Sequence, residues 1–382
     1  MKHYDWLIVG AGFTGATLAE RIASQLGQKV LVIDQRDHIA GNAFDAPEAD
    51  GLLVHRYGPH IFHTNSDTVW NYLSGFTAWR PYFHKVLGHI DGQFVPLPFN
   101  INSIETIFPQ KLAQDIIGAL VDDIGFNQRV PILKLLESDR PELKLIADYV
   151  FEKVFKNYTL KQWGLLPTEL NAGVTARVPI AISRDDRYFT DRFQAMPRDG
   201  YTAMFKRMLD HPNIDVQLST PWSPSFPEVA DRMIFTGPID AYFGEAHGPL
   251  PYRSLRFDFV REAKRHYQPV GTVNYPNEFE FTRITEQKYL SDHQSDDTLL
   301  VFEYPEAYVP GTNDPYYPIL NDASQSLLNR YTDDAKDIAD SVLFAGRLAD
   351  YCYYNMDQAC ARALSLFTKR IVPMADGKTR GR

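Results

Sequence analysis

Two short apolar runs enclose a helical stripe at the start of the chain. Trp6 to Val9 form an uninterrupted apolar run, which is typical of a strand buried on both faces of a parallel sheet. From about Thr14 to Gly27, apolar side chains recur at helical spacing, at Leu18, Ile22 and Leu26. A second apolar run ends at Ile33. The pattern predicts one strand–helix–strand unit over residues 4–34.

The apolar period is helical between about Ser103 and Leu166. Gly164 and Pro167 end this pattern beside Trp163. We therefore predict a helical domain inserted into the first domain, and we expect the segment after Trp163 to be a mobile loop. The repeating apolar residues are Leu112, Ile116, Ile117, Leu120, Leu143, Ile146, Tyr149, Val150, Val154 and Phe155.

Strand-like runs follow on both sides of this helical segment. His84 to Pro98 predict a hairpin closed by Asp91-Gly92, which favours a type I′ turn. Two later apolar runs, Met233–Gly237 and Val342–Gly346, end in glycine as the first strand does, and a helix is predicted from about Met356 to Phe367. The chain is thus expected to return twice to the first sheet. Four further runs predict an antiparallel sheet, at Leu255–Val260, Val270–Tyr275, Phe279–Ile284 and Leu299–Tyr304.

The composition is that of a soluble globular chain with room for two or three domains. Of its 382 residues, 44% are hydrophobic and 23% are charged. The sequence contains no run of eighteen apolar residues, so we expect no transmembrane helix. The first strand begins so early that we expect no signal peptide. Two cysteines, Cys352 and Cys360, make no disulfide framework, so we expect a cytoplasmic location. The net charge of −9 argues against nucleic acid binding.

Three glycines after the first strand carry the first chemical signal. Gly10, Gly12 and Gly15 follow the G-x-G-x-x-G pattern, in which the glycines allow a tight turn, the approach of a pyrophosphate and close helix packing. Asp34 lies nineteen residues after Gly15, where a carboxylate binds a ribose and disfavours a 2′-phosphate. The pattern predicts an adenine dinucleotide, either FAD or NAD. An ordinary strand–helix turn is the alternative.

Two polar loops follow the second strand. Gly41-Asn42 form a turn that either lies along the dinucleotide or is an ordinary surface turn. His55, His60 and His63 lie close together, but no cysteine or suitably spaced acidic residue completes a metal site, and none is predicted. The turn at Gly58-Pro59 suggests a loop that presents His60 to a ligand.

Ten motifs together resemble the UDP-galactopyranose mutase family, flavoenzymes that interconvert the pyranose and furanose forms of UDP-galactose. The resemblance covers nearly the whole chain, and the joint presence of HIFHTN and KQWG makes it specific. The motifs are GAGFTG (10–15), IDQRDHIAGNA (33–43), YGPHIFHTN (57–65), YTLKQWG (158–164), RFQAMPRDGYT (192–202), TGPIDAYF (236–243), YRSLRF (252–257), TRITEQKY (282–289), PYYP (315–318) and GRLADY (346–351).

The resemblance implies an α/β fold with a discontinuous Rossmann-like FAD-binding domain, an inserted helical domain and an antiparallel β-sheet domain. It also implies FAD that is active in its reduced form, UDP-galactose as the substrate and a role in cell-surface polysaccharide biosynthesis. We expect a homo-oligomer. The expected FAD-binding domain covers 1–84, 230–248 and 340–368, and the expected helical domain with its mobile loop covers 100–175. The expected antiparallel sheet domain covers 85–99, 176–229 and 249–339. A flexible tail is expected over 369–382.

The resemblance also implies site residues, position by position. Arg177 and Arg283 match the two arginines that hold the substrate pyrophosphate, and His60 matches the histidine beside the flavin ring. The other substrate-binding positions are Tyr158, Thr159, Trp163, Tyr188, Arg253, Asn274, Tyr317 and Tyr353. The cofactor-binding positions are Gly10, Gly12, Phe13, Thr14, Gly15, Asp34, Gln35, Gly41, Asn42, His60, Ile61, Gly346, Arg347, Asn355 and Met356.

Three positions depart from the family's pattern. Ala40 replaces the first glycine of the usual GGN, His84 stands where an asparagine is common, and Asn355 stands where an aspartate is common near the flavin. The last two weaken inferences about fine substrate contacts. None of the three removes a group that the chemistry needs.

The implied reaction has no net redox change. Ring contraction needs the anomeric carbon to leave UDP and the sugar ring to open and reclose, and the reduced flavin N5 is the expected nucleophile at that carbon. The paired arginines would bind the pyrophosphate and stabilise the charge that grows on the departing UDP. The turn at Gly346-Arg347 would bring positive backbone dipoles near the flavin.

Two other functions remain open from the sequence. An FAD-dependent oxidoreductase of the amine-oxidase type would share the fold, but would oxidise its substrate and lack the paired arginines. A regulatory protein that binds a flavin without turnover is the other. Taken singly, Arg177 and Arg283 could be surface ion-pair residues, and Trp163 could be a core residue.

Overall fold

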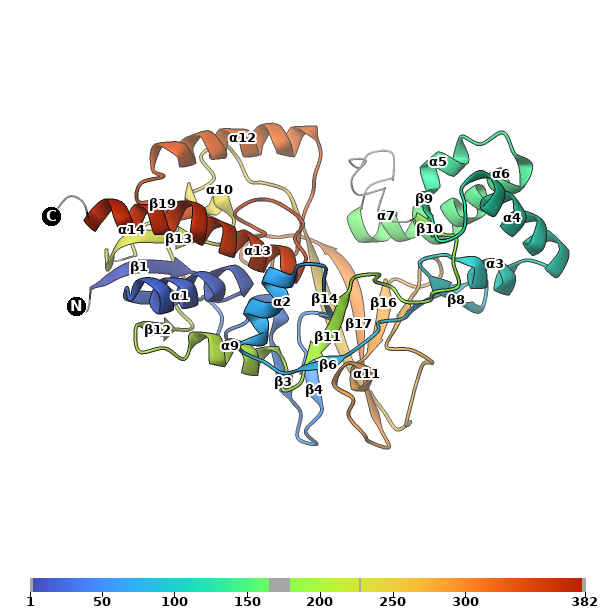
Figure 1. Ribbon diagram of the computed structural model, residues 1–382, viewed down its shortest axis with the longest axis horizontal. Helices are drawn as coiled ribbons and strands as arrows, with labels where there is room; N and C mark the ends of the chain where they lie inside the picture. Colours follow the sequence, from blue (N-terminus) through green and yellow to red (C-terminus); the bar gives the residue numbers. More distant parts are fainter. Residues whose placement is uncertain (1–2, 165–178, 227, 380–382) are drawn as a thin grey trace.

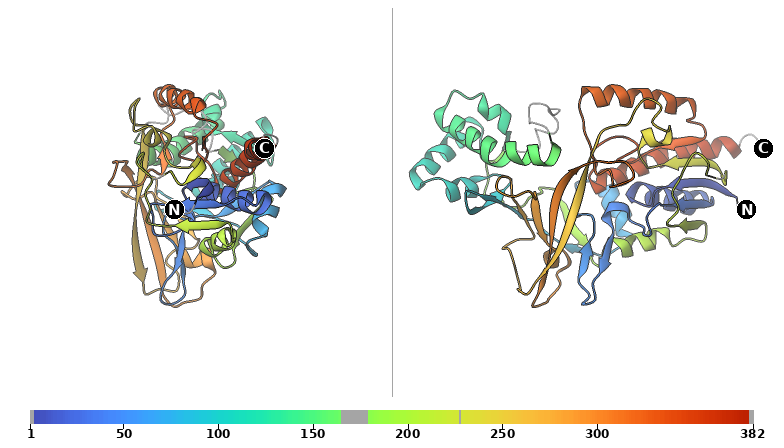
Figure 2. Two further views of the ribbon diagram at one scale, coloured as in Figure 1. Left: turned by 90° about the vertical axis from the view of Figure 1, so that its left-hand side faces the viewer. Right: turned by 180° about the vertical axis from the view of Figure 1, so that it is seen from behind.

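A computed structural model describes residues 3–164, 179–226 and 228–379 of the chain. The molecule is elongated, with a layered α/β domain at one end, a twisted sheet in the middle and a helical lobe at the other end (Figures 1 and 2). Both ends of the chain lie at the α/β end (Figure 1). The expected fold class, a Rossmann-like α/β domain with a helical part and an antiparallel sheet, is confirmed.

The α/β domain is built on a five-stranded sheet in which every pairing is parallel. Its order is β12–β2–β1–β13–β19, so the chain returns to the first sheet after the central segment and again near its end, as predicted. β12 was not predicted here, because residues 176–229 were assigned to the antiparallel sheet domain. The strands are β1 (Tyr4–Val9), β2 (Val30–Ile33), β12 (Ile214–Gln217), β13 (Ala230–Phe235) and β19 (Val342–Phe344).

Apolar side chains cover both faces of this sheet, as its uninterrupted apolar runs predict. Trp6 and Ile8 belong to a core that includes residues of α1 (Phe13–Leu26), α9 (Tyr201–Leu209) and α13 (Met356–Leu366). Leu7 and Leu31 face the other side, where Trp222, Phe226 and Val229 cover them. Two helices, α10 (Ile239–Tyr242) and α12 (Asp322–Asp337), form a smaller apolar cluster nearby.

A seven-stranded sheet forms the middle of the molecule, in the order β18–β14–β17–β16–β15–β7–β8. Its pairings are antiparallel except for β15 with β7. The predicted hairpin is confirmed, with positive φ angles of 49° at Asp91 and 78° at Gly92. The strands are β7 (Val86–Ile90), β8 (Gln93–Leu97), β14 (Tyr252–Glu262), β15 (Thr272–Asn274), β16 (Arg283–Glu286), β17 (Thr298–Ala307) and β18 (Tyr317–Pro318).

The helical lobe packs around an apolar core that it shares with β7 and β8 of the middle sheet. Gly164, with a φ of 68°, ends its last helix in the left-handed conformation. The helices are α3 (Ile101–Ile107), α4 (Gln110–Asp123), α5 (Ile132–Leu136), α6 (Pro141–Val150), a π-helical turn (Phe151–Lys156) and α7 (Asn157–Trp163), with a small pair of strands, β9 (Arg129–Pro131) and β10 (Pro179–Ala181).

Short elements join the α/β domain to the middle sheet. The hairpin of β3 and β4 precedes a three-stranded sheet in the order β5–β11–β6. These elements are η1 (Gly41–Ala43), β3 (Asp45–Pro47), β4 (Leu53–His55), β5 (Phe62–Thr64), α2 (Asp67–Ser74), β6 (Trp79–Pro81) and β11 (Phe193–Pro197).

The tail that was expected to be flexible from residue 369 is helical through Thr379. A π-helical turn (Phe367–Ile371) leads into α14 (Val372–Thr379). Ile371 is fully buried, and Val372 and Met374 pack against the core of the α/β domain. Apolar packing therefore orders a segment whose basic end had suggested fraying.

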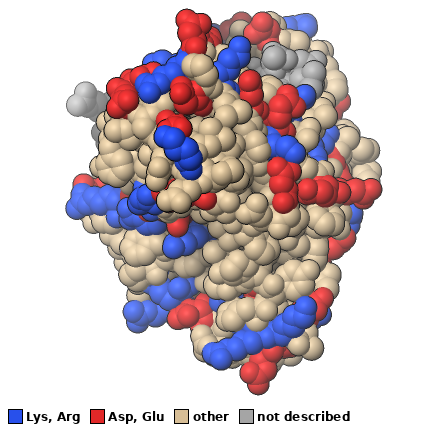
Figure 3. Space-filling model, turned by 90° about the vertical axis from the view of Figure 1, so that its right-hand side faces the viewer, with Lys and Arg blue, Asp and Glu red and all other residues tan. Residues whose placement is uncertain are grey.

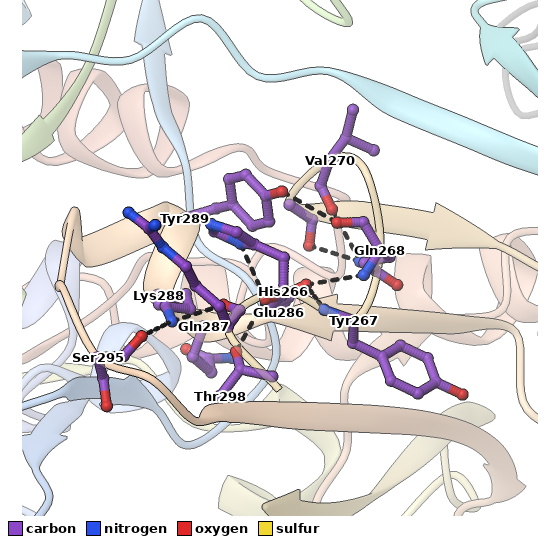
Figure 4. Close-up of polar contacts among 12 residues, drawn as sticks. His266, Tyr267, Gln268, Val270, Glu286, Gln287, Lys288, Tyr289, Ser295 and Thr298 are labelled. Carbon is purple, nitrogen blue, oxygen red and sulfur yellow. Dashed lines mark hydrogen bonds and ion pairs between the residues drawn. The ribbon is translucent and has the colours of Figure 1, made fainter. Parts of the chain in front are cut away.

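A buried polar cluster fixes the short helix α11 (Gln287–Ser291) between β16 and β17 (Figure 4). The carboxylate of Glu286, which is fully buried, accepts hydrogen bonds from the backbone N–H groups of Tyr267 and Gln268 and from the hydroxyl of Thr298. The ammonium of Lys288 donates to the carbonyl oxygens of Arg265, Ser295 and Asp297. Because both buried charges have several partners, this segment is firmly held.

Acidic and basic side chains are interspersed over the face of the molecule that carries the helical lobe (Figure 3). Within residues 3–164, 179–226 and 228–379, no helix is both long enough and apolar enough to cross a membrane.

Candidate active site

A cavity of about 810 Å³ lies where the α/β domain, the middle sheet and the helical lobe meet. Its size is that of a site for a cofactor or a small-molecule substrate. Of the predicted cofactor positions, those that line it are Gly12, Phe13, Thr14, Gly15, Asn42, His60, Ile61, Gly346, Arg347, Asn355 and Met356. Of the predicted substrate positions, those that line it are Tyr158, Thr159, Trp163, Tyr188, Asn274, Arg283, Tyr317 and Tyr353.

Several predicted positions do not line this cavity. Arg177 lies outside the described residues, as does the segment after Gly164 in which the mobile loop was expected. Arg253 donates from Nε to the carbonyl oxygen of Gln162 over 3.2 Å, so it supports the end of α7 from outside the lining. Gly10, Asp34, Gln35 and Gly41 are also absent from the lining.

The glycine turn before α1 has the geometry that its sequence predicts. A Cβ atom at Gly15 would lie 1.9 Å from the carbonyl oxygen of Gly10, so only glycine allows α1 to pack this closely. Gly12 is the N-cap residue of α1, and no side chain accepts a hydrogen bond from the first turn there. A Cβ atom on Gly12 would meet only the Cα of Gly41, at 3.8 Å. The first N–H groups of α1 are therefore available to an anion such as a pyrophosphate.

Asp34 supports this turn directly. Its Oδ2 accepts the backbone N–H of Ala11 over 2.8 Å, and its Oδ1 accepts the backbone N–H of Arg36 over 3.0 Å. The predicted bond from Asp34 to a ribose stays a prediction. Arg36 in turn donates to Oδ1 of Asn42 over 2.9 Å, which fixes a cavity-lining side chain.

The N-terminus of α13 forms the opposite wall of the cofactor end. Gly346 has a φ of 115° and lines the cavity with Arg347. Asn355 is the N-cap residue of α13, and its backbone N–H donates to Oε1 of Gln358 in the first turn over 2.9 Å. The positive end of this helix dipole therefore faces the cavity, and it favours negative charge there.

Arg283 is the buried cation of the substrate end. Its Nη2 donates to the hydroxyl of Tyr158 over 2.8 Å, and its Nε lies 3.2 Å from Oε1 of Glu303. Burial alone would lower the pKa of Arg283, but the carboxylate of Glu303 raises it well above its ordinary value. Arg283 therefore stays charged at the cavity wall.

Arg283, Asn274 and Glu303 form one row across three neighbouring strands. Asn274 pairs with Arg283 between β15 and β16, and Arg283 pairs with Glu303 between β16 and β17. All three line the cavity, and Oδ1 of Asn274 is buried without a hydrogen-bond partner among the described residues. A buried, unsatisfied acceptor beside a cation suits a polar ligand.

His60 is neutral and its tautomer follows from its partner. Nδ1 lies 2.9 Å from the carbonyl oxygen of Gly58, which can only accept, so Nδ1 carries the proton and Nε2 is an acceptor. Burial lowers the pKa of His60 to about 4. The backbone N–H of His60 donates to Nδ1 of His55 over 3.1 Å, which holds the turn in place.

The other two histidines of the sequence cluster have separate roles. His63 contacts Asp191 over 3.0 Å and stacks on Phe189, while His55 supports the turn of His60. Across the described parts of the chain, no group of three or more His, Cys, Asp or Glu side chains is arranged to hold a metal ion.

His84, where the family commonly has asparagine, lies on the cavity wall. Its Nδ1 lies 3.2 Å from the hydroxyl of Tyr82. Burial, together with the charges of Arg283 and His63, lowers the pKa of His84 to about 3. This chain therefore presents a neutral imidazole at that position.

Aromatic side chains cover another part of the substrate end. Tyr317 and Tyr353 are stacked with ring centroids 5.6 Å apart, and Trp163 lies 5.8 Å from Tyr317. Such a wall can shield a bound sugar nucleotide from water.

Glu303, the ion-pair partner of Arg283, was not among the predicted site residues. A signal was present, because Glu303 shares a face of β17 with the buried residues Leu299 and Val301. A carboxylate at an inward position of a strand needs a partner, and this pattern could have indicated one.

Known proteins resemble this chain over most of its length. The model of the UDP-galactopyranose mutase family matches residues 153–353, and that of an NAD(P)-binding Rossmann-like domain matches residues 8–76. The chain is 38% identical to a probable UDP-galactopyranose mutase of Klebsiella pneumoniae, over 95% of this chain and 94% of that protein. It is 33% identical to a dTDP-fucopyranose mutase of Escherichia coli, over 94% of this chain and 96% of that protein.

A solved structure of a UDP-galactopyranose mutase has the same fold as this chain. A crystal structure of reduced UDP-galactopyranose mutase superposes with a TM-score of 0.73 at 15% identity, over 98% of this chain and 95% of that one. At this identity the superposition supports the fold alone. With the family match over more than half of the chain, it follows that the chain belongs to the UDP-galactopyranose mutase family.

Proposed function

We propose that this protein interconverts UDP-galactopyranose and UDP-galactofuranose. The observation that carries the proposal is the buried, charge-bearing Arg283 in a cavity shared with a dinucleotide-binding glycine turn. A cation held by Glu303 and Tyr158 suits the pyrophosphate of a sugar nucleotide. Membership of the mutase family supports the same reaction.

The proposed cofactor is FAD. The space in front of Gly12 and the N–H groups of α1 fit its pyrophosphate, and Gly346, Arg347 and Met356 would border its ring system. When bound in its reduced form, FAD supplies a nucleophilic N5 for the anomeric carbon, with no net redox change.

Arg283 has two tasks in this proposal. It binds the pyrophosphate through paired N–H donors, and it stabilises the negative charge that grows on UDP as the bond to the sugar breaks. Glu303 keeps the guanidinium charged and oriented, while Tyr158 ties it to α7. Arg177, outside the described residues, is the proposed second arginine.

His60 would hold or move a proton near the reacting centre. Its Nε2 is unprotonated at neutral pH, so it can accept a proton from a sugar hydroxyl that lies within hydrogen-bond reach. The aromatic wall of Trp163, Tyr317 and Tyr353 would exclude water, which could otherwise hydrolyse an activated sugar.

An oxidoreductase of the amine-oxidase type is the alternative. It would draw on the same dinucleotide turn, but it has no need of a buried arginine at the substrate end. The Arg283–Glu303 pair therefore favours the mutase.

The test is an anaerobic assay of purified, FAD-loaded protein. UDP-galactofuranose should be converted to the pyranose by the dithionite-reduced protein and not by the oxidised protein. Equal rates in both states would contradict the role of reduced flavin, and net oxidation of the substrate would favour the alternative. Replacement of UDP-galactofuranose by dTDP-fucofuranose tests whether the substrate of the Escherichia coli relative is used instead.

Two variants make the assay specific. Arg283→Ala should lower kcat/KM by about 10² or more with flavin content retained, since a contact that strengthens in the transition state is lost. Arg256→Ala removes an exposed arginine of β14, which pairs with Asp258 and Glu306, and should leave kcat/KM unchanged. Near wild-type turnover by Arg283→Ala would show that this residue does not bind the pyrophosphate.

A further inference from the structure

A second cavity, of about 250 Å³, lies behind the turn that carries His60. His60 lines the large cavity and His55 lines the second one, and the N–H of His60 donates to Nδ1 of His55. The walls of the second cavity come from the β3–β4 hairpin, the start of α9, the β6–β11 pair and α11. Its polar lining residues are Asp45, His55, Arg80, Arg198, Asp199, Tyr201, Ser291 and His293.

His55 offers this cavity a buried hydrogen-bond donor. Only 3% of the residue is exposed. Because Nδ1 accepts a backbone N–H, it carries no proton, and in the neutral ring the proton lies on Nε2. Burial lowers the pKa of His55 to about 4, which keeps the ring neutral. No described residue accepts a hydrogen bond from Nε2.

The strand pattern aims this ring at the cavity. Leu53 and His55 share one face of β4, because side chains two residues apart point the same way. A Cβ atom at Gly200, another lining residue, would lie 2.4 Å from Cδ2 of Leu53, so this face of β4 looks onto the cavity wall. Nε2–H of His55 is thus the donor left for a ligand.

Two arginines bring positive charge to the same cavity. Arg80 on β6 lies opposite Met196 on β11, and Arg198 follows two residues later, so strand pairing brings both to one wall. Within the described parts of the chain, neither guanidinium has a carboxylate within ion-pair distance. Arg80 donates from Nη2 to the carbonyl oxygen of Leu290, and its other N–H groups can donate to a ligand.

The carboxylates of this cavity are already engaged. Asp45 accepts the N–H groups of Tyr201 and Thr202 over 2.7 and 2.8 Å, and so caps α9. Asp199 pairs with Arg207. Two guanidinium groups without an ion-pair partner face the single carboxylate of Asp45, so the net charge of the lining is positive.

The α11 wall is rigid. Gln287 accepts the backbone N–H of His55 over 3.0 Å, and Leu290 holds Arg80. Both residues belong to the helix that the buried charges of Glu286 and Lys288 fix in place (Figure 4). The donors are thus held in position before any ligand arrives, which lowers the entropic cost of binding.

We propose that the second cavity binds a small oxyanion of the phosphate class, held by Arg80, Arg198 and Nε2–H of His55. Guanidinium groups suit the oxygen geometry of such an ion, and the neutral N–H donor of His55 adds a directional bond. The volume is below the range of roughly 300–1,000 Å³ that is usual for larger ligands, so a complete sugar nucleotide is excluded. The inference is independent of the reaction proposed for the large cavity.

The test is equilibrium dialysis of the intact, FAD-loaded protein with radiolabelled inorganic phosphate at constant ionic strength. Arg283→Ala serves as the background, because it removes the buried cation at the substrate end of the large cavity. Saturable binding should persist there at one phosphate per chain. Loss of the binding in Arg283→Ala would assign the phosphate to the large cavity and overturn the proposal.

Three further variants locate the site. Arg80→Gln and Arg198→Gln should each weaken phosphate binding about tenfold or more. His55→Asn is the sharpest variant, because the asparagine oxygen can still accept the N–H of His60 while the Nε2–H donor is lost, and binding should weaken several-fold. Arg192→Gln removes an exposed arginine that pairs with Asp67, and should leave the affinity unchanged.

Two further outcomes contradict the proposal. No saturable binding at millimolar phosphate means that the cavity holds water only. Binding that is equally strong in Arg198→Gln, His55→Asn and Arg192→Gln means non-specific attraction. Because Arg198 is exposed, its replacement does not threaten the fold, and thermal melting of each variant checks this directly.

Discussion

The guanidinium of Arg283 donates a hydrogen bond to the hydroxyl of Tyr158 over 2.8 Å, and this bond joins the middle sheet to the last helix of the lobe. Both side chains line the large cavity. The cation at the substrate end is therefore held from two parts of the molecule, by Glu303 within the sheet and by Tyr158 from α7. Replacement of Tyr158 or Glu303 should therefore alter the position of Arg283 and its contact with the substrate.

Tyr158→Phe should lower kcat/KM about tenfold, because a hydrogen bond to a charged group contributes roughly 1.5–3 kcal/mol. Flavin content should stay at the wild-type level. Steady-state kinetics with UDP-galactofuranose measure the effect. Tyr149→Phe is the matched control, since that hydroxyl contacts Asp91 on the lobe surface, and it should change nothing. Equal effects of the two substitutions would mean that the Tyr158 bond is unimportant for the reaction.

Glu303→Ala should destabilise the fold by about 3 kcal/mol, because it leaves the buried Arg283 without its counter-charge. Urea denaturation followed by circular dichroism gives the free energy of unfolding. Glu306→Ala on the same strand removes an exposed partner of Arg256 and should cost less than about 1 kcal/mol. A Glu303→Ala variant as stable as Glu306→Ala would rule out an essential ion pair.

Gly15→Ala should greatly reduce FAD retention, because its new Cβ would lie 1.9 Å from the carbonyl oxygen of Gly10 and push α1 away from the turn. Absorbance of the purified protein measures bound flavin. Gly118→Ala, in the middle of α4, meets no atom within 4 Å and should be stabilising by up to about 1 kcal/mol. Normal flavin content in Gly15→Ala would refute the steric argument.

The protein should lose stability as the pH falls from about 6.5 to 4. Burial lowers the pKa values of His55, His60 and His84 to about 4, 4 and 3, against an ordinary value of 6.5. In this window the unfolded chain binds protons that the folded chain does not, so each histidine disfavours folding increasingly as the pH drops. Above about pH 7 these histidines are unprotonated in both the folded and the unfolded chain, so they do not change the free energy of unfolding with pH.

At pH 5, each of these histidines should lower the free energy of unfolding by about 2 kcal/mol relative to pH 7.5. Urea denaturation at the two pH values measures the difference. His84→Asn carries the family's common residue, which does not titrate, and should remove about a third of the histidine contribution. An unchanged pH dependence in this variant would mean that His84 has the same pKa in the folded and unfolded states.

The sequence predicts those parts of the fold that depend on local backbone geometry. Three spaced glycines beside a buried strand predict the dinucleotide turn, and Asp91-Gly92 predicts the hairpin, because both motifs depend on local backbone geometry. Glu303 escaped notice because its partner Arg283 lies twenty residues earlier and meets it only through strand pairing. Arg80 and Arg198 come together in the same way, across β6 and β11.

Other differences have equally specific causes. β12 is a four-residue edge strand, which is too short for its alternation to assign it to a particular sheet. α14 follows a basic segment, and the apolar residues that dock it, Val372 and Met374, are few. Arg253 matches a substrate position in sequence, but its guanidinium is held by the carbonyl oxygen of Gln162 at the end of α7.

The row of Asn274, Arg283 and Glu303 makes correct assembly of the sheet a condition for activity. Neighbouring side chains on a strand point to opposite faces, so β16 displaced by one residue would turn Ile284 toward the cavity and Arg283 away from it. Such a misregistered chain could keep most of its backbone hydrogen bonds and still bind FAD in the other domain. Bound flavin is therefore an insufficient quality test for preparations of this protein, and loss of catalysis in loop variants over 276–282 can report a slipped strand.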